Sequence, residues 1–449
     1  MAEIEFFNRQ EHGTVQVPAE GLLPEPQTLA ESGLRLDLVV QMVLKQLHFA
    51  GELTGIALAD RLGLVFPIIE PAIDQLKSQS LCEIVGGTNL GPPSYRYRIT
   101  HLGRERAGLL LEGNKYAGVA PVPVDQYRRF METYKATHPV RVTRKEVREA
   151  FRHLVLSDRV LDQVGPAVNG EHSLFCYGPP GNGKTVISQA IRNLMIDDFW
   201  VPSALEVDGS IIQVFDPVNH DPLTEADTSL LLDRPARQDP RWVRCRRPLV
   251  TVGGELTLDA LELSFNPVSG YYRAPVQLLA NGGVLVIDDF GRQRESPHAL
   301  LNRWIAPLES RVDYLLLQSG QKVDLPFHVL VVFATNLKPA ELVDEAFLRR
   351  IHYKVLAESP TPDDYRQIFE NYCRSKEVPY DPSMVDYLLT QVYPARNIPL
   401  RGCHPRDLID QALALARYLE QPRRLTTYLL EAACDTYFVD ETQGVSTAS

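Results

Sequence analysis

The sequence lacks any long apolar run, and none of its runs approaches the roughly 20 residues that a membrane-spanning helix needs. Its first residues, MAEIEFFNRQEHG, contain neither the basic segment nor the apolar segment of a secretory leader. These two absences predict a cytoplasmic chain with no segment inserted in a membrane.

Cysteine is scarce and scattered, with six residues placed singly along 449 and no C-x-x-C pair. Disulfide scaffolds are short, secreted and dense in cysteine, and zinc sites need ligands at close, paired spacing. The sequence therefore predicts reduced thiols and no metal held by cysteine. The six are Cys82, Cys176, Cys245, Cys373, Cys403 and Cys434.

An excess of positive charge is also absent, because 57 acidic residues against 46 basic ones give a formal charge of −11. This balance argues against a protein that coats nucleic acid with its whole surface, although local basic patches remain open. The length predicts about two to four domains.

Proline and glycine mark the expected boundaries between domains. Residues 1–32 are proline-containing and polar without periodicity, which predicts an extended, poorly ordered arm. Residues 112–127 are rich in Gly and Pro and are predicted to link two domains. Residues 443–449 are expected to be a frayed tail.

The segment after the arm has a recognisable order of elements. Helical spacing over 34–49, 56–62 and 68–81 precedes two strand-like runs, CEIVGG and YRYRIT, around a Gly/Pro-rich tip. This order resembles a winged-helix domain, so residues 33–111 are expected to form a small α+β unit. Winged helices read DNA in some proteins and dock other proteins in others.

Charge on the third helix bears on that choice, because Glu70 and Asp74 outnumber Lys77 there. A DNA-recognition helix needs Arg, Lys, Asn or Gln directed at phosphates and base edges. We therefore expect protein docking or assembly contacts ahead of DNA reading, with DNA contact left open by basic residues near the wing. These are Arg96, Arg98, Arg104 and Arg106.

A G-x-x-x-x-G-K-T motif lies between the strand-like run SLFCYG and the helical run VISQAIRNLM. In that context the glycines let backbone N–H groups wrap a phosphate. Lys184 is expected to reach the β- and γ-phosphates of ATP, and Thr185 to ligate Mg²⁺. The predicted nucleotide-binding residues are Gly178, Pro179, Pro180, Gly181, Asn182, Gly183, Lys184 and Thr185.

A second motif, GVLVIDD at 283–289, is a fully apolar run that ends in two carboxylates. Such a run is typical of a strand buried on both faces of a parallel sheet. Asp288 is expected to hold the metal and its water. Asp289 stands where a general base or water-orienting carboxylate is needed.

Together these motifs resemble an AAA+ ATPase, with the phosphate loop as Walker A and VLVIDD as Walker B. The resemblance implies a doubly wound parallel α/β domain over 128–357 and an α-helical lid over 358–442. It also implies ATP and Mg²⁺ as cofactors and a homo-oligomeric ring, with six subunits expected. The family usually has Asp-Glu where this chain has Asp288 and Asp289, a difference that concerns hydrolysis rather than nucleotide binding.

Further landmarks follow in the order of that family. Asn336, at the end of HVLVVFATN, matches the sensor 1 position. The stretch DEAFLRRIHYKV resembles the segment that supplies an arginine finger to a neighbouring subunit, with Arg349 and Arg350 as the two candidates and a salt-bridged helix end as the alternative. Arg406 matches sensor 2 and is expected to touch the γ-phosphate from the lid.

Between SIIQVFD at 210–216, interpreted as a strand of the sheet, and Walker B lies a span far longer than one crossover helix requires. An arginine cluster within it is either a phosphate-facing or partner-facing patch at a subunit interface or an exposed strand pair neutralised by nearby acids. The arginines are Arg237, Arg241, Arg244, Arg246 and Arg247, and the acids are Asp227, Asp233 and Asp239.

Two more features are interpreted through the resemblance. In AAA+ protein remodellers the loop before the helix APVQLLANGG faces the central channel, which makes Tyr271 and Tyr272 candidate pore residues. Packing against the sheet edge is the alternative. The run over 311–327 predicts a β-hairpin before sensor 1, similar to the branch of MoxR-type and magnesium-chelatase-type ATPases.

Three functions are compatible with these features. The first is a ring-forming Mg-ATP hydrolase that remodels protein complexes and meets a protein client or adaptor through its winged helix. The second is a DNA-linked ATPase, a loader or transcription regulator, whose winged helix binds DNA. The third is a nucleotide-gated switch with little turnover. The acidic charge and the acidic third helix favour the first.

Overall fold

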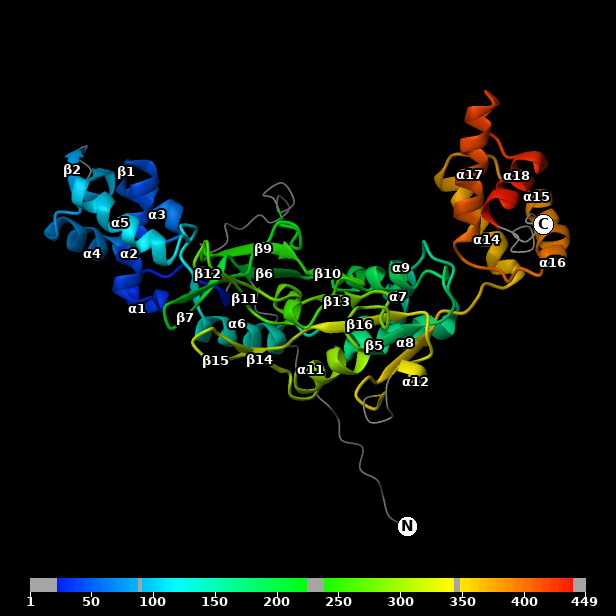
Figure 1. The fold of residues 1–449 in the computed structure, drawn as a ribbon, viewed down its shortest axis with the longest axis horizontal. Coiled ribbons are helices and arrows are strands. Elements are labelled where there is room, and N and C mark those ends of the chain that lie inside the picture. Colours follow the sequence, from blue (N-terminus) through cyan, green and yellow to red (C-terminus); the bar gives the residue numbers. More distant parts are fainter. Residues whose placement is uncertain (1–21, 88–90, 224–237, 343–347, 439–449) are drawn as a thin grey trace, which may run out of the picture.

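The computed structural model describes residues 22–87, 91–223, 238–342 and 348–438. Figure 1 shows an elongated arrangement, with a small N-terminal domain at one end, a helical domain at the other and a larger α/β body between them. The predicted tail at 443–449 and residues 1–21 of the predicted arm lie outside the described residues.

The N-terminal domain contains helices packed on a three-stranded antiparallel sheet of order β1-β3-β2. Its core contains the completely buried side chains of Val43 from α2, Leu58 from α3 and Ile69 from α4. The elements follow the order expected from the sequence. They are α1 Leu29–Ser32, α2 Leu36–Ala50, β1 Glu52–Thr54, α3 Gly55–Leu62, α4 Phe66–Ser78, β2 Cys82–Gly86, η2 Pro92–Ser94, β3 Arg96–Ile99 and α5 His101–Gly113.

The expected boundaries of this domain are wrong in two places. Residues 22–32, assigned to a poorly ordered arm, are structured: Leu23 is buried, and its carbonyl accepts a hydrogen bond from the backbone N–H of Asp239 at 3.0 Å. The predicted linker ends in strand β4 (Val122–Pro123) and in the start of helix α6 (Val124–Thr137). Both segments bury apolar side chains in the α/β body, which the local sequence does not reveal.

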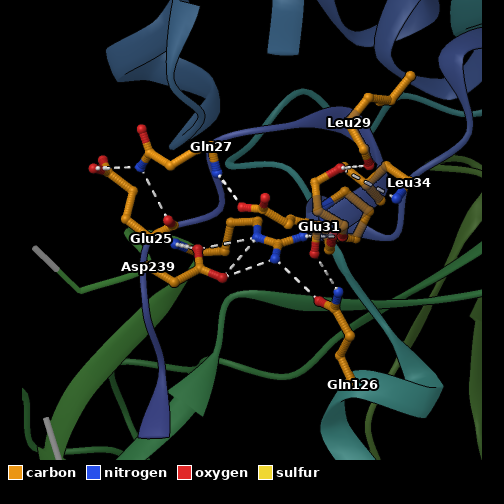
Figure 2. A network of polar contacts seen from close by, with 10 residues as sticks. Glu25, Gln27, Leu29, Glu31, Leu34, Gln126 and Asp239 are labelled. Carbon is orange, nitrogen blue, oxygen red and sulfur yellow. Dashed lines mark hydrogen bonds and ion pairs between the residues drawn. The ribbon is translucent and has the colours of Figure 1, made fainter. Parts of the chain in front are cut away.

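Arg241 joins the N-terminal segment to the α/β body through hydrogen bonds to Ser32 and Gln126. Figure 2 shows the surrounding network of polar contacts, with Glu31, Gln126 and Asp239 labelled. The Arg241 guanidinium donates to both carboxylate oxygens of Asp239, at 2.8 to 3.0 Å, and to the carbonyl of Ser32 at 2.9 Å. It also donates to the side-chain oxygen of Gln126 on α6 at 3.0 Å. Because the Arg241 and Asp239 side chains are only 2 % and 5 % exposed, the pair is a buried ion pair.

Replacing Arg241 with alanine is therefore expected to destabilise the protein by about 3–5 kcal/mol, since it leaves the Asp239 charge buried without a partner. Calorimetric unfolding measures the loss, and Arg246→Ala, an exposed arginine of the neighbouring strand, is the matched control. The double variant Arg241→Met/Asp239→Leu should recover most of the stability. Equal melting temperatures for Arg241→Ala and Arg246→Ala would contradict this assignment.

The arginine cluster is thus largely internal. Arg244 donates to Asp198 at 2.7 Å, and Arg247 is buried and donates to the carbonyl of Gly282 at 2.9 Å. Arg241 pairs with Asp239, one of the acids of the neutralised alternative, but the expected exposed strand pair is wrong for Arg241 and Arg247, which are buried. Arg237, Asp227 and Asp233 lie outside the described residues.

The α/β body is built on a five-stranded parallel sheet of order β10-β13-β16-β5-β17. Side chains alternate between its faces: Leu174 and Cys176 pack toward α8 and α9, and Phe175 packs toward Trp304 of α11. Both faces are covered, which confirms the doubly wound α/β class. The elements are α7 Arg144–Ala150, α8 Asp158–Asn169, β5 Leu174–Tyr177, α9 Lys184–Ala190, η3 Ile191–Leu194, β10 Leu249–Val252, α10 Val276–Leu279, β13 Val284–Ile287, α11 Pro297–Ser310, β16 Leu330–Thr335, α12 Pro339–Leu342 and β17 Tyr353–Leu356.

A second five-stranded sheet, of order β11-β12-β8-β7-β4, lies between this body and the N-terminal domain (Figure 1). The segment 210–216, interpreted as a strand of the main sheet, contributes β8 to this second sheet instead. The Walker B strand β13 instead lies between β10 and β16, and both pair with it in parallel. The second sheet comprises β7 Ala204–Val207, β8 Ser210–Gln213, β11 Ser264–Asn266 and β12 Tyr271–Arg273 besides β4, with η5 Asp259–Leu261 preceding β11.

Two antiparallel strand pairs complete the body. The first pair is β6 (Asp198–Pro202) and β9 (Trp242–Arg246), and β9 contains Arg244 and Arg246 of the arginine cluster. The pair β14 (Val312–Leu316) and β15 (Lys322–Pro326) forms the hairpin predicted ahead of β16.

The C-terminal domain is entirely helical over its described residues. Its core joins Tyr365 and Phe369 of α14 to Leu408 of α17 and Leu429 of α18. Its elements are α14 Pro362–Ser375, α15 Pro382–Tyr387, a π-helical turn Leu388–Val392, α16 Tyr393–Arg396, α17 His404–Tyr418 and α18 Thr427–Tyr437. None of the helices in the described parts of the chain combines the length and apolar character needed to cross a membrane.

Candidate nucleotide site

The candidate site lies at the carboxyl ends of β5, β13 and β16, three adjacent strands of the main sheet. Open parallel sheets bind ligands at this edge, because the loops after the strands converge there. The phosphate loop leaves β5 at Gly178 and enters α9 at Lys184. The strand, loop and helix predicted from the sequence are all present.

Lys184 is directed back over its own loop. Its ammonium donates to the carbonyls of Gly178 at 3.0 Å and Pro179 at 2.9 Å, and the residue is buried. Burial lowers the pKa of this ammonium. A buried ammonium with movable donors, held only by backbone carbonyls, fits a residue that binds phosphate oxygens.

A direct hydrogen bond joins the phosphate loop to the carboxyl end of β13. The Thr185 hydroxyl donates to a carboxylate oxygen of Asp288 at 2.7 Å, although the residues are 103 positions apart in sequence. A hydroxyl and a carboxylate at this edge are the oxygen ligands that Mg²⁺ prefers beside a nucleotide. Among the described residues, no three His, Cys, Asp or Glu side chains gather into a separate metal cluster.

Asp289 and Asn336 form a second pair at the same edge. The Asn336 side-chain amide donates to a carboxylate oxygen of Asp289 at 3.3 Å. Asp289 has a φ of +47°, a left-handed conformation that Asp tolerates better than bulky residues and that clusters at functional sites. The side chain of Asp289 is exposed, so it is accessible to a bound nucleotide and its water.

Comparison with known protein families gives two matches. The family model described as magnesium chelatase, subunit ChlI, matches residues 158–215, the segment that contains the phosphate loop. This partial match supports the resemblance to AAA+ ATPases that the motifs indicate. A second model, described as a domain of unknown function (DUF8689), matches residues 361–436 of the C-terminal helical domain.

Solved structures with detectable similarity include the RuvB Holliday junction branch migration motor of Thermotoga maritima and NtrX of Brucella abortus. The RuvB comparison has 14 % identity and a TM-score of 0.37, covering 64 % of this chain and 70 % of RuvB. The NtrX comparison has 14 % identity and a TM-score of 0.40, covering 67 % of this chain and 59 % of NtrX. No curated protein matches the sequence.

The two arginine-finger candidates differ in their surroundings. Arg350 donates through Nε to the carboxylate of Glu309 on α11 at 2.5 Å, as the salt-bridged alternative anticipates. Arg349 is exposed. Part of the quoted stretch, residues 343–347, lies outside the described residues.

Arg406 lies in the first turn of α17, where it donates to the carboxylate of the adjacent Asp407 at 2.8 Å. That hydrogen bond raises the pKa of the guanidinium. A different lid residue, Arg401, acts electrostatically on Lys184 and donates to Ser359 at 2.9 Å. Sequence reasoning missed Arg401; the available signal was a second arginine five residues before Arg406.

Tyr271 and Tyr272 lie in strand β12, not in a loop. Tyr272 is buried, and its hydroxyl accepts a hydrogen bond from the backbone N–H of Gln318 at 2.9 Å. Tyr271 packs edge-on against Tyr116, with ring centroids 5.7 Å apart. The expectation of two accessible pore rings is therefore wrong for Tyr272, and the packing alternative describes both residues.

Proposed function

We propose that this AAA+ ATPase hydrolyses Mg-ATP between the subunits of a homo-oligomeric ring, with six subunits expected, and uses the energy to remodel protein complexes. The observation that carries the hydrolytic part is the convergence of Lys184, Thr185–Asp288 and Asp289–Asn336 at one sheet edge. Phosphoryl transfer needs this combination of a cation, metal ligands and a water-orienting pair.

Each residue has a role in the proposal. Lys184 binds the β- and γ-phosphates, and Thr185 and Asp288 would hold Mg²⁺, which when bound neutralises charge on the phosphate oxygens. Asp289 and Asn336 orient the attacking water. Arg349 or Arg350 of a neighbouring subunit stabilises the phosphoryl group during transfer, and Arg406 links the lid to the nucleotide state.

The N-terminal domain, which we propose to be a winged helix, supports protein docking over DNA reading. On its wing, Arg96 and Arg98 both pair with Glu52, at 3.3 and 3.0 Å. On α4, Lys77 pairs with Asp74 at 2.7 Å. Because each of these cations already faces a carboxylate, the surface offers less charge to a phosphate backbone than its sequence suggests.

The remodelling role is tested with Asp289→Asn, which is expected to bind ATP but to hydrolyse it at least about a hundredfold more slowly, because it loses its water-orienting carboxylate. Pull-downs with this variant in ATP should retain a protein partner that is released on exchange into ADP. Wild-type protein in ADP is the control.

Recovery of nucleic acid alone would contradict the protein-remodelling role and support the DNA-linked function. The same conclusion would follow if duplex DNA bound the full chain with steep salt dependence, the signature of phosphate contacts.

A further inference from the structure

Asn182, in the middle of the phosphate loop, contacts two distant segments at once. Its side-chain N–H groups donate to the carbonyl of Ala357 at 3.3 Å and to the Ser359 hydroxyl at 3.4 Å. Its side-chain oxygen accepts from the backbone N–H of Gly402 at 3.2 Å. Ala357 and Ser359 lie between β17 and the lid, and Gly402 precedes lid helix α17. We call this set of contacts the Asn182 bridge.

The neighbouring loop residues pack against the same two segments. A Cβ at Gly178, where φ is +138°, would meet the carbonyl oxygen of Ala357 at 2.5 Å. A Cβ at Gly181, where φ is +79°, would meet the sulfur of Cys403 at 2.5 Å. The backbone N–H of Cys403 also donates to the carbonyl of Gly181 at 2.7 Å. The loop is therefore in direct contact with two segments. One is residues 357–359, which join β17 to the lid and are called the hinge here; the other is the lid turn, residues 401–403.

The lid turn is also connected to the core of the lid. His404, next in sequence, is buried, and its ring hydrogen-bonds the Tyr393 hydroxyl at 3.0 Å, which hydrogen-bonds the Tyr365 hydroxyl at 2.8 Å. Burial lowers the pKa of His404 to about 4, so the ring is neutral at physiological pH and its bond to Tyr393 is not interrupted by protonation. A displacement of the turn would therefore move α17 with it.

We propose that Asn182 is a positioning residue that couples occupancy of the phosphate loop to the orientation of the lid. The proposal rests on the nucleotide site proposed above. When Lys184 exchanges the carbonyls of Gly178 and Pro179 for phosphate oxygens, the loop changes shape, and Asn182 transmits the change because its amide bonds the hinge on one side and the lid turn on the other.

A nucleotide in the loop can shift the orientation of the lid only if it binds the protein with different free energies in the two lid orientations, and the shift is limited by that difference. Asn182 supplies a side-chain contact through which that difference arises, beside the backbone bond between Cys403 and Gly181. It is distinct from Arg406, whose contact in this structure is Asp407 rather than the loop.

Hydrogen exchange of the full-length protein, with and without saturating ADP, tests the proposal. In the wild type we expect ADP to slow exchange in the phosphate loop and, by about tenfold, in the first turns of α17, within the usual range of coupling between sites. Because Asn182 belongs to the phosphate loop, each protein is compared at equal ADP occupancy, set from its own ADP titration. At that occupancy Asn182→Ala should show the ADP effect in the loop and lose most of it in α17, where the backbone bond from Cys403 to Gly181 remains. The matched control is Asn193→Ala, which replaces an exposed asparagine in η3, just after α9. This variant should respond as the wild type does.

Ser359→Ala provides a second variant. It leaves the bonds of Asn182 to Ala357 and Gly402 in place, but it also removes the acceptor of Arg401 in the lid turn, so it should reduce the α17 response only in part. A residue with a merely structural role would change exchange equally with and without ADP.

An α17 response in Asn182→Ala equal to that of the wild type would overturn the proposal, as would a wild-type protein whose loop responds to ADP while α17 does not. Failure of ADP to protect even the wild-type loop would instead overturn the proposed nucleotide site, and the bridge with it.

Discussion

Replacing Lys184 with alanine is expected to abolish ATP hydrolysis, lowering kcat/KM by at least about a hundredfold to a thousandfold, the range for losing one preorganised electrostatic donor. The ammonium of Lys184 lies over the phosphate loop with only the carbonyls of Gly178 and Pro179 as acceptors, and no other described lysine occupies this position. Steady-state phosphate release measures the loss.

Nucleotide binding should be lost together with turnover. A ligand at a hundred times its dissociation constant stabilises the folded state by about 2.7 kcal/mol, so ADP should raise the melting temperature of the wild type and not that of Lys184→Ala. Lys145→Ala, an exposed lysine of α7, is the matched control and should behave as wild type in both assays. Undiminished turnover in Lys184→Ala would refute the site.

Removal of the arginine finger should have an effect as large, because such a residue contributes about 10³ to 10⁵ in kcat. We expect this loss from Arg349→Ala or from Arg350→Ala, because the sequence offers both arginines as the finger. Nucleotide affinity should change little in Arg349→Ala, since the phosphate loop is intact; fluorescent ADP titration separates this variant from Lys184→Ala.

Mixing the two inactive variants shows whether the arginine acts on a neighbouring subunit. In an equimolar ring of Arg349→Ala and Lys184→Ala subunits, about a quarter of the head-to-tail interfaces combine an intact loop with an intact arginine. Activity should therefore return to a similar fraction of wild type. If the mixture stays inactive although the subunits co-assemble, the assignment in trans is wrong; the mixture with Arg350→Ala then tests the other candidate.

The nucleotide site could be predicted from the sequence to a large extent. Gly178 to Thr185, Asp288 and Asn336 each lie at the end of an apolar run, and a strand that ends at the carboxyl edge of a parallel sheet delivers its next residues to one place. The pairing of Thr185 with Asp288 and of Asp289 with Asn336 follows from this rule.

Three predictions were wrong because the position of the residues depends on partners far away in the sequence, which the local pattern does not show. A short apolar run such as SIIQ has the same appearance in either sheet, and only its pairing with β7 and β12 places β8 in the second one. Tyr272 was expected at a pore because, by the resemblance to AAA+ remodellers, it precedes the helix APVQLLANGG, yet its ring is buried against Phe265. Arg241 was expected in an exposed cluster, yet its burial depends on Ser32 and Gln126.

By itself, the sequence predicted a glycine-rich loop between a strand and a helix, a buried strand that ends at Asp288, a doubly wound sheet and a helical C-terminal domain, because each depends on periodicity or motif within a few tens of residues. Only the tertiary structure decided which arginines are buried, which strand lies beside Walker B and what Asn182 contacts. The physical reason is distance along the chain: Asn182 and Gly402 are 220 residues apart, so a hydrogen bond between them depends on how the main sheet and the C-terminal helices pack together.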